Sequence, residues 1–234
     1  MAKRFIDLCL SVLALVMLSP VFAAAAAGIR LTSPGPVFYN ARRMGRRGSV
    51  FVMWKFRTMH VRPETGSAIT AHNDSRVFLV GRILRALKID ELPQLWNVLK
   101  GEMSFVGPRP EDPRIVAHHY DAIGMETLEV APGLASPGSL FNYTHGHQFL
   151  NDDDPEGSYV HQLLPLKLAM EAVYVRQSSL WYDVQIVLRT ALTILQIAAG
   201  RRLFPDPPEL VLARTLLSPP DAQPQGSAVL SRAA

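Results

Sequence analysis

The stretch KRFIDLCLSVLALVMLSPVFAAAAAGIR, residues 3–30, is almost wholly apolar after its two basic residues. As one helix rising about 1.5 Å per residue, its ~25 apolar residues would be long enough to cross a hydrocarbon core about 30 Å thick. Ser19-Pro20 interrupts that helix, because proline lacks a backbone N–H and clashes with the preceding turn. Residues 5–18 alone would cover only about 21 Å. The sequence therefore predicts a helix that enters a bilayer and breaks at Ser19 and Pro20.

Basic residues flank the apolar run on both sides. Lys3 and Arg4 precede it, and Arg30 follows it, with more arginines between positions 42 and 47. Since basic flanks tend to stay on the cytoplasmic side, two of them favour a re-entrant membrane helix hairpin that returns to the face it entered. A spanning helix with a tolerated proline kink is the alternative. A cleaved signal peptide would explain the alanines at 23–27, but no disulfide-bearing secreted domain follows.

The remaining sequence indicates one folded domain followed by a tail. Ser-Pro-Gly-Pro at 33–36 predicts a turn that ends the membrane segment. The single cysteine, Cys9, lies in the apolar run, so one chain cannot form a disulfide or a cysteine-based metal site, and a reducing, cytosol-facing domain fits. We expect a re-entrant anchor at 1–32, a folded domain at 33–203 and a flexible, proline-rich tail at 204–234.

Local patterns predict an α/β chain of the α+β kind that is mainly helical and contains a small β-hairpin. The hairpin strands are expected at 37–41 and 49–56, around a glycine-bearing loop. Periodicity predicts helices at about 76–87, 91–99, 114–124, 159–175 and 179–199. Asp74 or Ser75 would cap the first of these, and Asp90 the second. The last is amphipathic and suits a helix lying in the membrane interface, with core packing as the alternative.

Two adjacent acidic residues suggest phosphate chemistry. Asp90 and Glu91 stand at a predicted helix start, where amide donors and the helix dipole would keep Asp90 ionised. An ionised aspartate can attack phosphorus and form a covalent intermediate, which divides one difficult transfer into two easier ones. Glu91 can hold Mg²⁺, which prefers a few carboxylates together with substrate phosphate oxygens. Taken alone, the pair would be a common helix cap and first-turn acid.

Basic residues elsewhere could hold phosphate oxygens. Lys55 and Arg57 alternate along a predicted strand and would project from one face. Arg109 stands between two prolines, so a stiff backbone would aim its guanidinium. Arg85 adds positive charge on the helix that leads to the carboxylates. Each of these residues, taken alone, also fits a solvated surface or a structural turn.

Two histidines offer a rival site for a metal. His145 and His147 would share one side of a strand, close in sequence to the acids at 152–154. No pattern predicts a strand there, and this spacing in a polar loop is more often incidental. The carboxylates at 90 and 91 are therefore the favoured site.

Three ordered motifs carry a resemblance to a known family. KFRTM at 55–59, DELPQLWNV at 90–98 and VGPRP at 106–110 strongly resemble motifs of the bacterial sugar transferases, also called monotopic phosphoglycosyl transferases. The similarity runs from about Lys3 to Arg201. One departure is PGLASPG at 132–138, where many members carry Pro-Gly-Ile-Thr-Gly, a region that we expect to shape nucleotide or sugar recognition.

The resemblance implies a glycosylphosphotransferase in the bacterial inner membrane, with its catalytic domain, here 33–203, on the cytoplasmic face. By the family's pattern, Asp90 attacks the β-phosphate of a UDP-sugar, releases UMP and forms a phosphosugar intermediate that undecaprenyl phosphate resolves. Glu91 would bind Mg²⁺. Arg109, Arg85, Lys55 and Arg57 match positions that, in the family, position phosphate or support the active site. The partners expected are the UDP-sugar, undecaprenyl phosphate and membrane lipid, without nucleic acid, for the first membrane step of polysaccharide or glycoconjugate synthesis.

A non-catalytic, basic membrane-associated module that binds anionic lipid or nucleic acid is the alternative. The 24 Lys and Arg residues against 20 Asp and Glu leave a net charge of +4, which suits any polyanion. Such a binder needs neither adjacent carboxylates at a helix start nor a stiff Arg109, and its affinity would fall steeply with salt. These residues therefore favour the enzyme.

Overall fold

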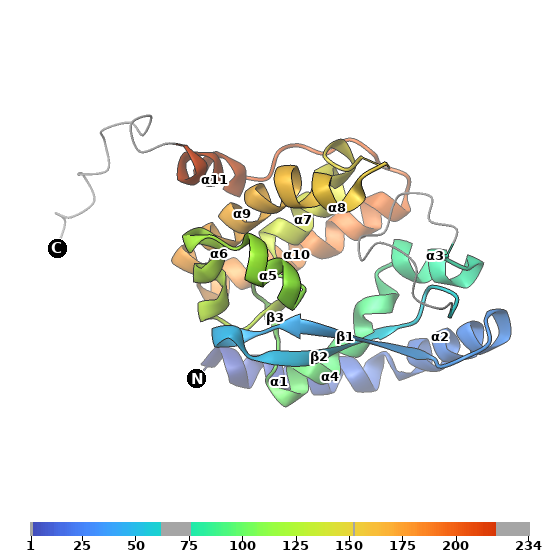
Figure 1. Ribbon diagram of the computed structural model, residues 1–234. Helices are drawn as coiled ribbons and strands as arrows, with labels where there is room; N and C mark the ends of the chain where they lie inside the picture. The colour runs from blue at the N-terminus through green and yellow to red at the C-terminus, as the bar shows by residue number, and fades with distance from the viewer. Residues whose placement is uncertain (1, 62–75, 152, 219–234) are drawn as a thin grey trace.

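The computed structural model describes residues 2–61, 76–151 and 153–218, which form a mainly helical chain with two small sheets (Figure 1). The α-helices are α1 (Ala2–Met17), α2 (Ser19–Thr32), α3 (Leu79–Ala86), α4 (Leu95–Lys100), α5 (Pro113–His119), α6 (Ala122–Glu126), α7 (Pro137–His145), α8 (Pro155–Ser158), α9 (Leu164–Gln177), α10 (Leu180–Ala198) and α11 (Glu209–Leu217). The strands are β1 (Phe38–Met44), β2 (Val50–Phe56), β3 (Ser104–Val106) and β4 (Gly133–Ala135). The 3-10 helices are η1 (Arg46–Gly48), η2 (Ile89–Gln94), η3 (Thr127–Glu129) and η4 (Gly146–Gln148), and η5 (Tyr159–Leu163) is a π-helical turn before α9. The predicted α/β class with few strands is confirmed.

One sheet is the predicted hairpin and the other was not predicted. β1 and β2 pair antiparallel from Phe38 opposite Phe56 to Met44 opposite Val50. β3 and β4 pair in parallel, and strands of three residues are too short to show a period of two. Just beyond β3, a Cβ on Gly107 would lie 2.3 Å from the Ala131 carbonyl oxygen. Only glycine allows this approach, which brings the loop after β3 against the loop that leads into β4.

The N-terminal helix breaks where the sequence predicts. α1 and α2 meet at an angle of 58°, Ser19 Oγ donates to the Val16 carbonyl (2.8 Å), and Pro20 occupies the first turn of α2. No single helix in the described part of the chain is long and apolar enough to cross a membrane, whereas α1 and α2 together pass as a bent pair. In Figure 1 the two helices, in blue, run along one side of the molecule beneath the β1–β2 hairpin.

Polar residues dock α1 on the rest of the chain. The Lys3 ammonium pairs with the Asp183 carboxylate of α10 (2.5 Å). Arg4 donates to the carbonyls of Val98 (2.5 Å) and Leu99 (2.8 Å) at the end of α4. Buried Asp7 accepts from Ser104 Oγ (2.8 Å) and from the Phe105 N–H (3.2 Å) of β3. The polar residues at the start of the apolar run therefore hold α1 against the domain.

Two predicted helices have different bounds. The helix predicted at 76–87 spans only Leu79–Ala86, and its expected caps, Asp74 and Ser75, lie outside the described residues. The helix predicted at 114–124 is divided into α5 and α6, because the Asp121 carboxylate accepts from the Gly124 N–H (2.8 Å) and caps a new helix.

The C-terminal segment differs from the flexible tail predicted from residue 204. α11 packs on α9, and Leu210 and Ala213, one turn apart, are buried there. Glu209 is only 4 % exposed, accepts from Tyr182 Oη (2.6 Å) and forms a two-bond ion pair with Arg189 of α10. A short apolar face and one partly buried ion pair thus order residues that composition alone marks as flexible. Residues 219–234 lie outside the described residues.

Replacing Glu209 is expected to destabilise the protein. In Glu209→Ala, Arg189 and Tyr182 lose their shared acceptor, at a cost of about 2 kcal/mol, because Arg189 keeps partial access to water. The midpoint of thermal unfolding of the purified protein should fall by several degrees. Glu156→Ala, an exposed acid in the first turn of α8, should leave it nearly unchanged. Equal midpoints for both variants would mean that the contacts of Glu209 with Tyr182 and Arg189 contribute little to stability.

Candidate active site

The two predicted carboxylates lie in a short turn between two helices. α3 ends at Ala86, and Asp90 and Glu91 stand in the first turn of η2, which continues into α4. The N-cap of η2 is Lys88, with no side-chain cap bond, so Asp90 is not the N-cap that the sequence predicts. Pro93 lies inside η2 and has no N–H to donate to a carbonyl of the preceding turn.

Glu91 is held by two cations from distant parts of the chain. Arg109 donates from both terminal nitrogens to its two carboxylate oxygens, at 2.7 Å and 3.2 Å. Lys55 Nζ, from β2, lies 3.6 Å from Oε1. Burial alone would raise the pKa of Glu91, but Arg109 and Lys55 hold it well below its usual value. Glu91 is therefore ionised throughout the physiological pH range.

Asp90 has one oxygen without a partner. It is 8 % exposed, and its Oδ1 has no hydrogen bond within the described residues. Burial, and then the charge of Glu91, raise the pKa of Asp90, while Lys55, Lys88 and Arg85 oppose that rise. The sequence predicted that a helix start would keep Asp90 ionised, whereas here the net effect of burial and of Glu91 is to raise its pKa, which the three cations only partly offset. Because this oxygen accepts no hydrogen bond, none has to be broken before the oxygen forms a bond to phosphorus.

The structure brings Lys55 and Arg109 to the carboxylates but places Arg57 elsewhere. The Arg57 guanidinium donates to the carbonyls of Pro36 (2.6 Å), Ser33 (2.7 Å) and Met59 (3.2 Å), and to Ser33 Oγ (2.7 Å). It thus holds the turn that follows α2. The strand alternation predicted that Arg57 would join Lys55 in holding phosphate, whereas the two side chains have different partners. Arg85, in the last turn of α3, acts on Asp90 through its charge.

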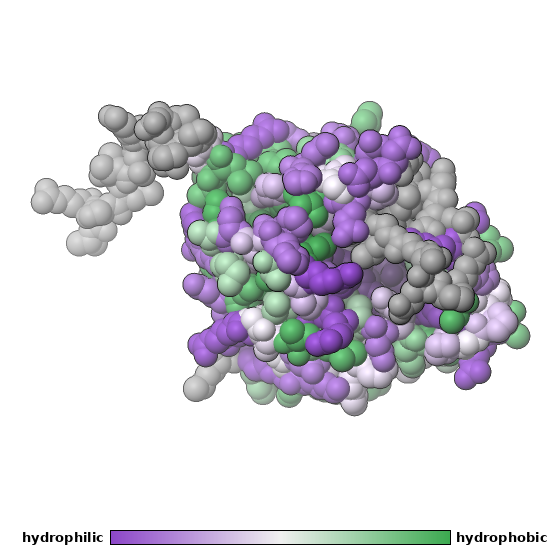
Figure 2. Space-filling view, in the orientation of Figure 1, coloured by the Kyte–Doolittle hydropathy of each residue, from purple (hydrophilic) through white to green (hydrophobic). Residues whose placement is uncertain are grey.

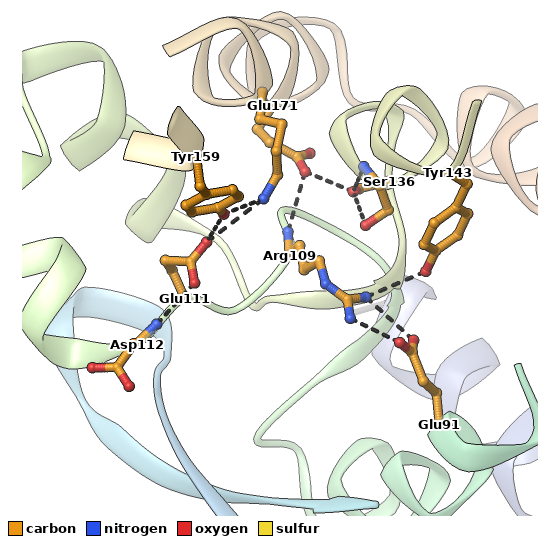
Figure 3. A network of polar contacts seen from close by, with 10 residues as sticks. Glu91, Arg109, Glu111, Asp112, Ser136, Tyr143, Tyr159 and Glu171 are labelled. Carbon is orange, nitrogen blue, oxygen red and sulfur yellow. Dashed lines mark hydrogen bonds and ion pairs between the residues drawn. The ribbon is translucent and has the colours of Figure 1, made fainter. Parts of the chain in front are cut away.

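A buried carboxylate on α9 positions the backbone of Arg109. Glu171 is 2 % exposed, and its Oε1 accepts from Ser136 Oγ (2.6 Å) and from the Arg109 N–H (3.3 Å), as Figure 3 shows. A Cβ on Gly138 would lie 2.6 Å from the same oxygen, so glycine is required for this packing. Glu171 therefore joins the loop after β3 to the loop after β4, where the sequence departs from the family pattern.

A second buried group supports the same loop from the other side. The Tyr159 hydroxyl donates to Glu111, and Lys167 Nζ donates to Tyr159 Oη (2.5 Å) and lies 3.6 Å from Glu111 (Figure 3). Lys167 and Glu171 were not predicted from the sequence. They are one turn apart in a helix whose other buried residues are mostly apolar, and that spacing was the signal available.

Glu171 should make stability depend on pH. Burial raises its pKa from 4.5 to about 7. The native state then keeps a proton that the unfolded chain releases above pH 4.5, so stability should fall as pH rises from about 4.5 to about 7, by up to roughly 3 kcal/mol. Glu171→Gln removes this titration. As pH rises across this range, the unfolding midpoint of the parent protein should therefore fall relative to that of Glu171→Gln. A difference between the two midpoints that does not change with pH would contradict this prediction.

The rival histidine site is not assembled. His145 stacks on Phe141 (5.0 Å between ring centroids), and its Nε2 lies 3.4 Å from Asp206. Across residues 2–61, 76–151 and 153–218, no three histidine, cysteine or acidic side chains are grouped so that they could hold a metal ion. Asp152, one of the expected neighbours, lies outside those residues.

Comparison with known proteins agrees with the motifs. Residues 1–197 match the family described as "Bacterial sugar transferase". The chain is 36% identical over 198 residues to the UDP-glucose:undecaprenyl-phosphate glucose-1-phosphate transferase of Xanthomonas campestris pv. campestris, covering 83% of this chain and 39% of the relative. It is 37% identical over 197 residues to the UDP-N-acetylgalactosamine-undecaprenyl-phosphate N-acetylgalactosaminephosphotransferase of Aeromonas hydrophila, covering 82% and 43%.

A third relative, a UDP-glucose:undecaprenyl-phosphate glucose-1-phosphate transferase of Caulobacter vibrioides, is 37% identical over 199 residues, covering 82% of this chain and 69% of the relative. The chain thus spans about two fifths of the length of the first two relatives and about two thirds of the third. All three matches include the segments that carry the carboxylates and Arg109, since they cover more than four fifths of this chain.

Proposed function

The chain belongs to the bacterial sugar transferase family, and from that premise we propose that it moves a sugar-1-phosphate from a UDP-sugar to undecaprenyl phosphate. The relatives named above act on these two kinds of substrate. The observation that carries the proposal is the partnerless oxygen of Asp90, which lies in a cluster of cations around two buried carboxylates. Such a cluster offsets the charge of a diphosphate that approaches a carboxylate.

The reaction would proceed in two displacements at one phosphorus atom. Asp90 Oδ1 attacks the β-phosphorus of the UDP-sugar, the bond to the bridging oxygen breaks, and UMP leaves with that oxygen and its electron pair. A phosphate oxygen of undecaprenyl phosphate then attacks the phosphosugar-Asp90 intermediate, and the Asp90 carboxylate is released. Arg109 and Lys55 balance negative charge in both steps, in a buried setting where that charge is poorly screened.

A divalent cation fits the residues present. Asp90 and Glu91 supply adjacent, hard carboxylate oxygens, and Asp90 Oδ1 is buried without a hydrogen bond in the described residues. Glu91, with Asp90 beside it, would hold Mg²⁺, which would neutralise phosphate charge when bound. Because Arg109 already occupies both oxygens of Glu91, the guanidinium and the ion would share that carboxylate.

We propose that α1 and α2 form a re-entrant anchor in the inner membrane, with the domain on the cytoplasmic face. Both ends of the helix pair contact the same domain, Lys3 through Asp183 and Ser33 through Arg57. Many of the side chains between these ends are apolar and exposed, among them Val16, which is 65 % exposed. The face of α10 that carries Trp181 and Leu188 is exposed as well and would lie in the interface. On the face seen in Figure 2, hydrophilic residues are interspersed with hydrophobic patches.

The enzymatic proposal is tested with purified full-length protein and Mg²⁺. Incubation with labelled UDP-glucose or UDP-N-acetylgalactosamine, followed by other UDP-sugars, is expected to release UMP and to label the protein with sugar-phosphate for at least one donor. EDTA should slow both, and added Mg²⁺ should restore them. If no UDP-sugar gives UMP or labelled protein, the alternative of a binding module without catalysis replaces this function.

Topology is tested separately by cysteine labelling. In a Cys9→Ser background, a cysteine placed at position 2 should be protected from a membrane-impermeant maleimide in intact cells and should react after the cells are opened. A cysteine in the β1–β2 turn, at Ser49, should behave in the same way. Labelling of position 2 from outside would show that α1 and α2 span the membrane.

A further inference from the structure

Lys88 has a backbone conformation that lysine rarely adopts. Its φ is +57° and its ψ is +18°, in the left-handed region, where its N–H donates to the Arg85 carbonyl (3.1 Å) and its carbonyl accepts from the Glu91 N–H (3.2 Å). Glycine or asparagine would make this turn with less strain. Strain of this kind collects at functional sites, so the lysine side chain itself needs a reason to be there.

The Lys88 ammonium faces the active site with its hydrogen-bond donors available. Its Nζ lies 3.7 Å from the centroid of the Tyr143 ring, whose hydroxyl oxygen is 3.4 Å from Arg109 Nη1. Among the described residues, Nζ has no hydrogen bond and no ion pair, although Asp90 and Glu91 are close enough for their charges to act on it. The ring covers one side of the ammonium by a cation–π contact.

We propose that Lys88 is a further phosphate-binding residue of this site and that the Tyr143 ring positions it. Lys88 Nζ would donate to a non-bridging phosphate oxygen of a substrate, beside Asp90. The inference rests on the proposed transfer and deepens it. A lysine ammonium is a compact charge on a flexible stem, so it can follow a phosphoryl group that changes partners, which the paired guanidinium of Arg109 cannot do without leaving Glu91.

Two substrates carry such oxygens, and the two half-reactions distinguish them. In the donor arm, full-length protein with Mg²⁺ is mixed with the labelled UDP-sugar that the parent protein accepts, without lipid, and the labelling rate is measured against donor concentration. In the acceptor arm, labelled protein is chased with undecaprenyl phosphate. Lys88→Met keeps the stem and removes the charge, and is expected to raise the half-saturating concentration about 10-fold or more in at least one arm.

The affected arm identifies the phosphate. A shift in the donor arm alone assigns Lys88 to the diphosphate of the UDP-sugar, a shift in the acceptor arm alone to the lipid phosphate, and a shift in both to the phosphosugar that the two steps share. Tyr143→Leu should give a smaller shift in the same arm, because Lys88 loses its support. Tyr143→Phe keeps the ring face, so its half-saturating concentration should shift less than that of Tyr143→Leu. A merely structural effect would change the maximal rate and would not give this order of half-saturating concentrations.

A second variant guards against a folding defect. Lys88→Gly removes the ammonium and relieves the left-handed strain, so it should fold even if Lys88→Met does not. The inference is overturned if the folded variant, Met or Gly, stays within twofold of the parent protein in both arms. If the parent protein is labelled by no UDP-sugar, the proposed function has failed and this inference falls with it. If the parent protein is labelled and the Lys88 variants keep its half-saturating concentrations, the role proposed for Lys88 is wrong but the proposed function stands.

Discussion

Asp90→Asn is expected to abolish labelling of the protein by sugar-phosphate and to lower the rate of UMP release by about 10³-fold or more. An amide has nearly the shape of the carboxylate but lacks a charged oxygen that can bond to phosphorus. The substitution also removes a buried charge whose pKa burial already raises, so the fold should be retained or slightly stabilised. A loss of activity together with an unchanged unfolding midpoint would separate chemistry from stability.

The matched control is Asp121→Asn. Asp121 caps α6 by accepting from the Gly124 N–H, and asparagine caps a helix about as well as aspartate. Donor labelling and UMP release should therefore stay near the parent values. If Asp90→Asn protein still became labelled by sugar-phosphate, the nucleophile would be another residue, although the transfer itself could stand.

Arg109→Ala is expected to lower kcat/KM for UMP release by about 10²- to 10³-fold. The variant loses a guanidinium that holds both oxygens of Glu91, and the backbone of the Pro-Arg-Pro loop stays in place through Glu171. Without Arg109, Lys55 remains beside Glu91, and the pKa of Glu91 should rise. Arg109→Lys should recover little of the activity, because one ammonium cannot replace two parallel hydrogen bonds.

Arg114→Ala is the control for Arg109. The Arg114 side chain is 76 % exposed and pairs with the helix cap Asp112, away from the carboxylates. Its removal should change kcat/KM by less than about twofold, since exposed ion pairs contribute little. If Arg109→Lys retained the parent rate, charge alone would be enough, and the two-bond contact with Glu91 would serve the fold and not the reaction.

Much of the site could be predicted from local sequence. Asp90 and Glu91 are neighbours on the chain, and Arg109 is stiffened by its own prolines, so local chemistry made them candidates, which the resemblance of their motifs to the family then favoured. Lys55 was selected by strand alternation, and the hairpin register bears out the strand. Arg57 could not be assigned in this way, because its partners, from Ser33 to Met59, are set by the path of the turn after α2.

The residues that support the site could not be found from neighbours in sequence. Glu171 meets Arg109 across 62 positions, and Tyr143 meets Lys88 only because α7 and the α3–η2 turn pack together. Likewise, Glu209 orders a segment whose composition predicts flexibility, through an ion pair with Arg189 that no local pattern reveals. Buried polar groups of this kind acquire their roles from partners that the chain brings together.

Local sequence was enough to predict the break at Ser19 and Pro20, the mainly helical class and the β1–β2 hairpin, and it places the two carboxylates side by side. The break, the helices and the hairpin follow from the covalent limits of proline or from a local periodicity, and the carboxylate pair from adjacency in the chain. Only the tertiary structure decided which carboxylate is paired and which has a free oxygen, because Arg109 and Lys55 reach Glu91 from remote segments. Electrostatic effects depend on distance in space and on exclusion of water, and neither is written in the spacing along a chain.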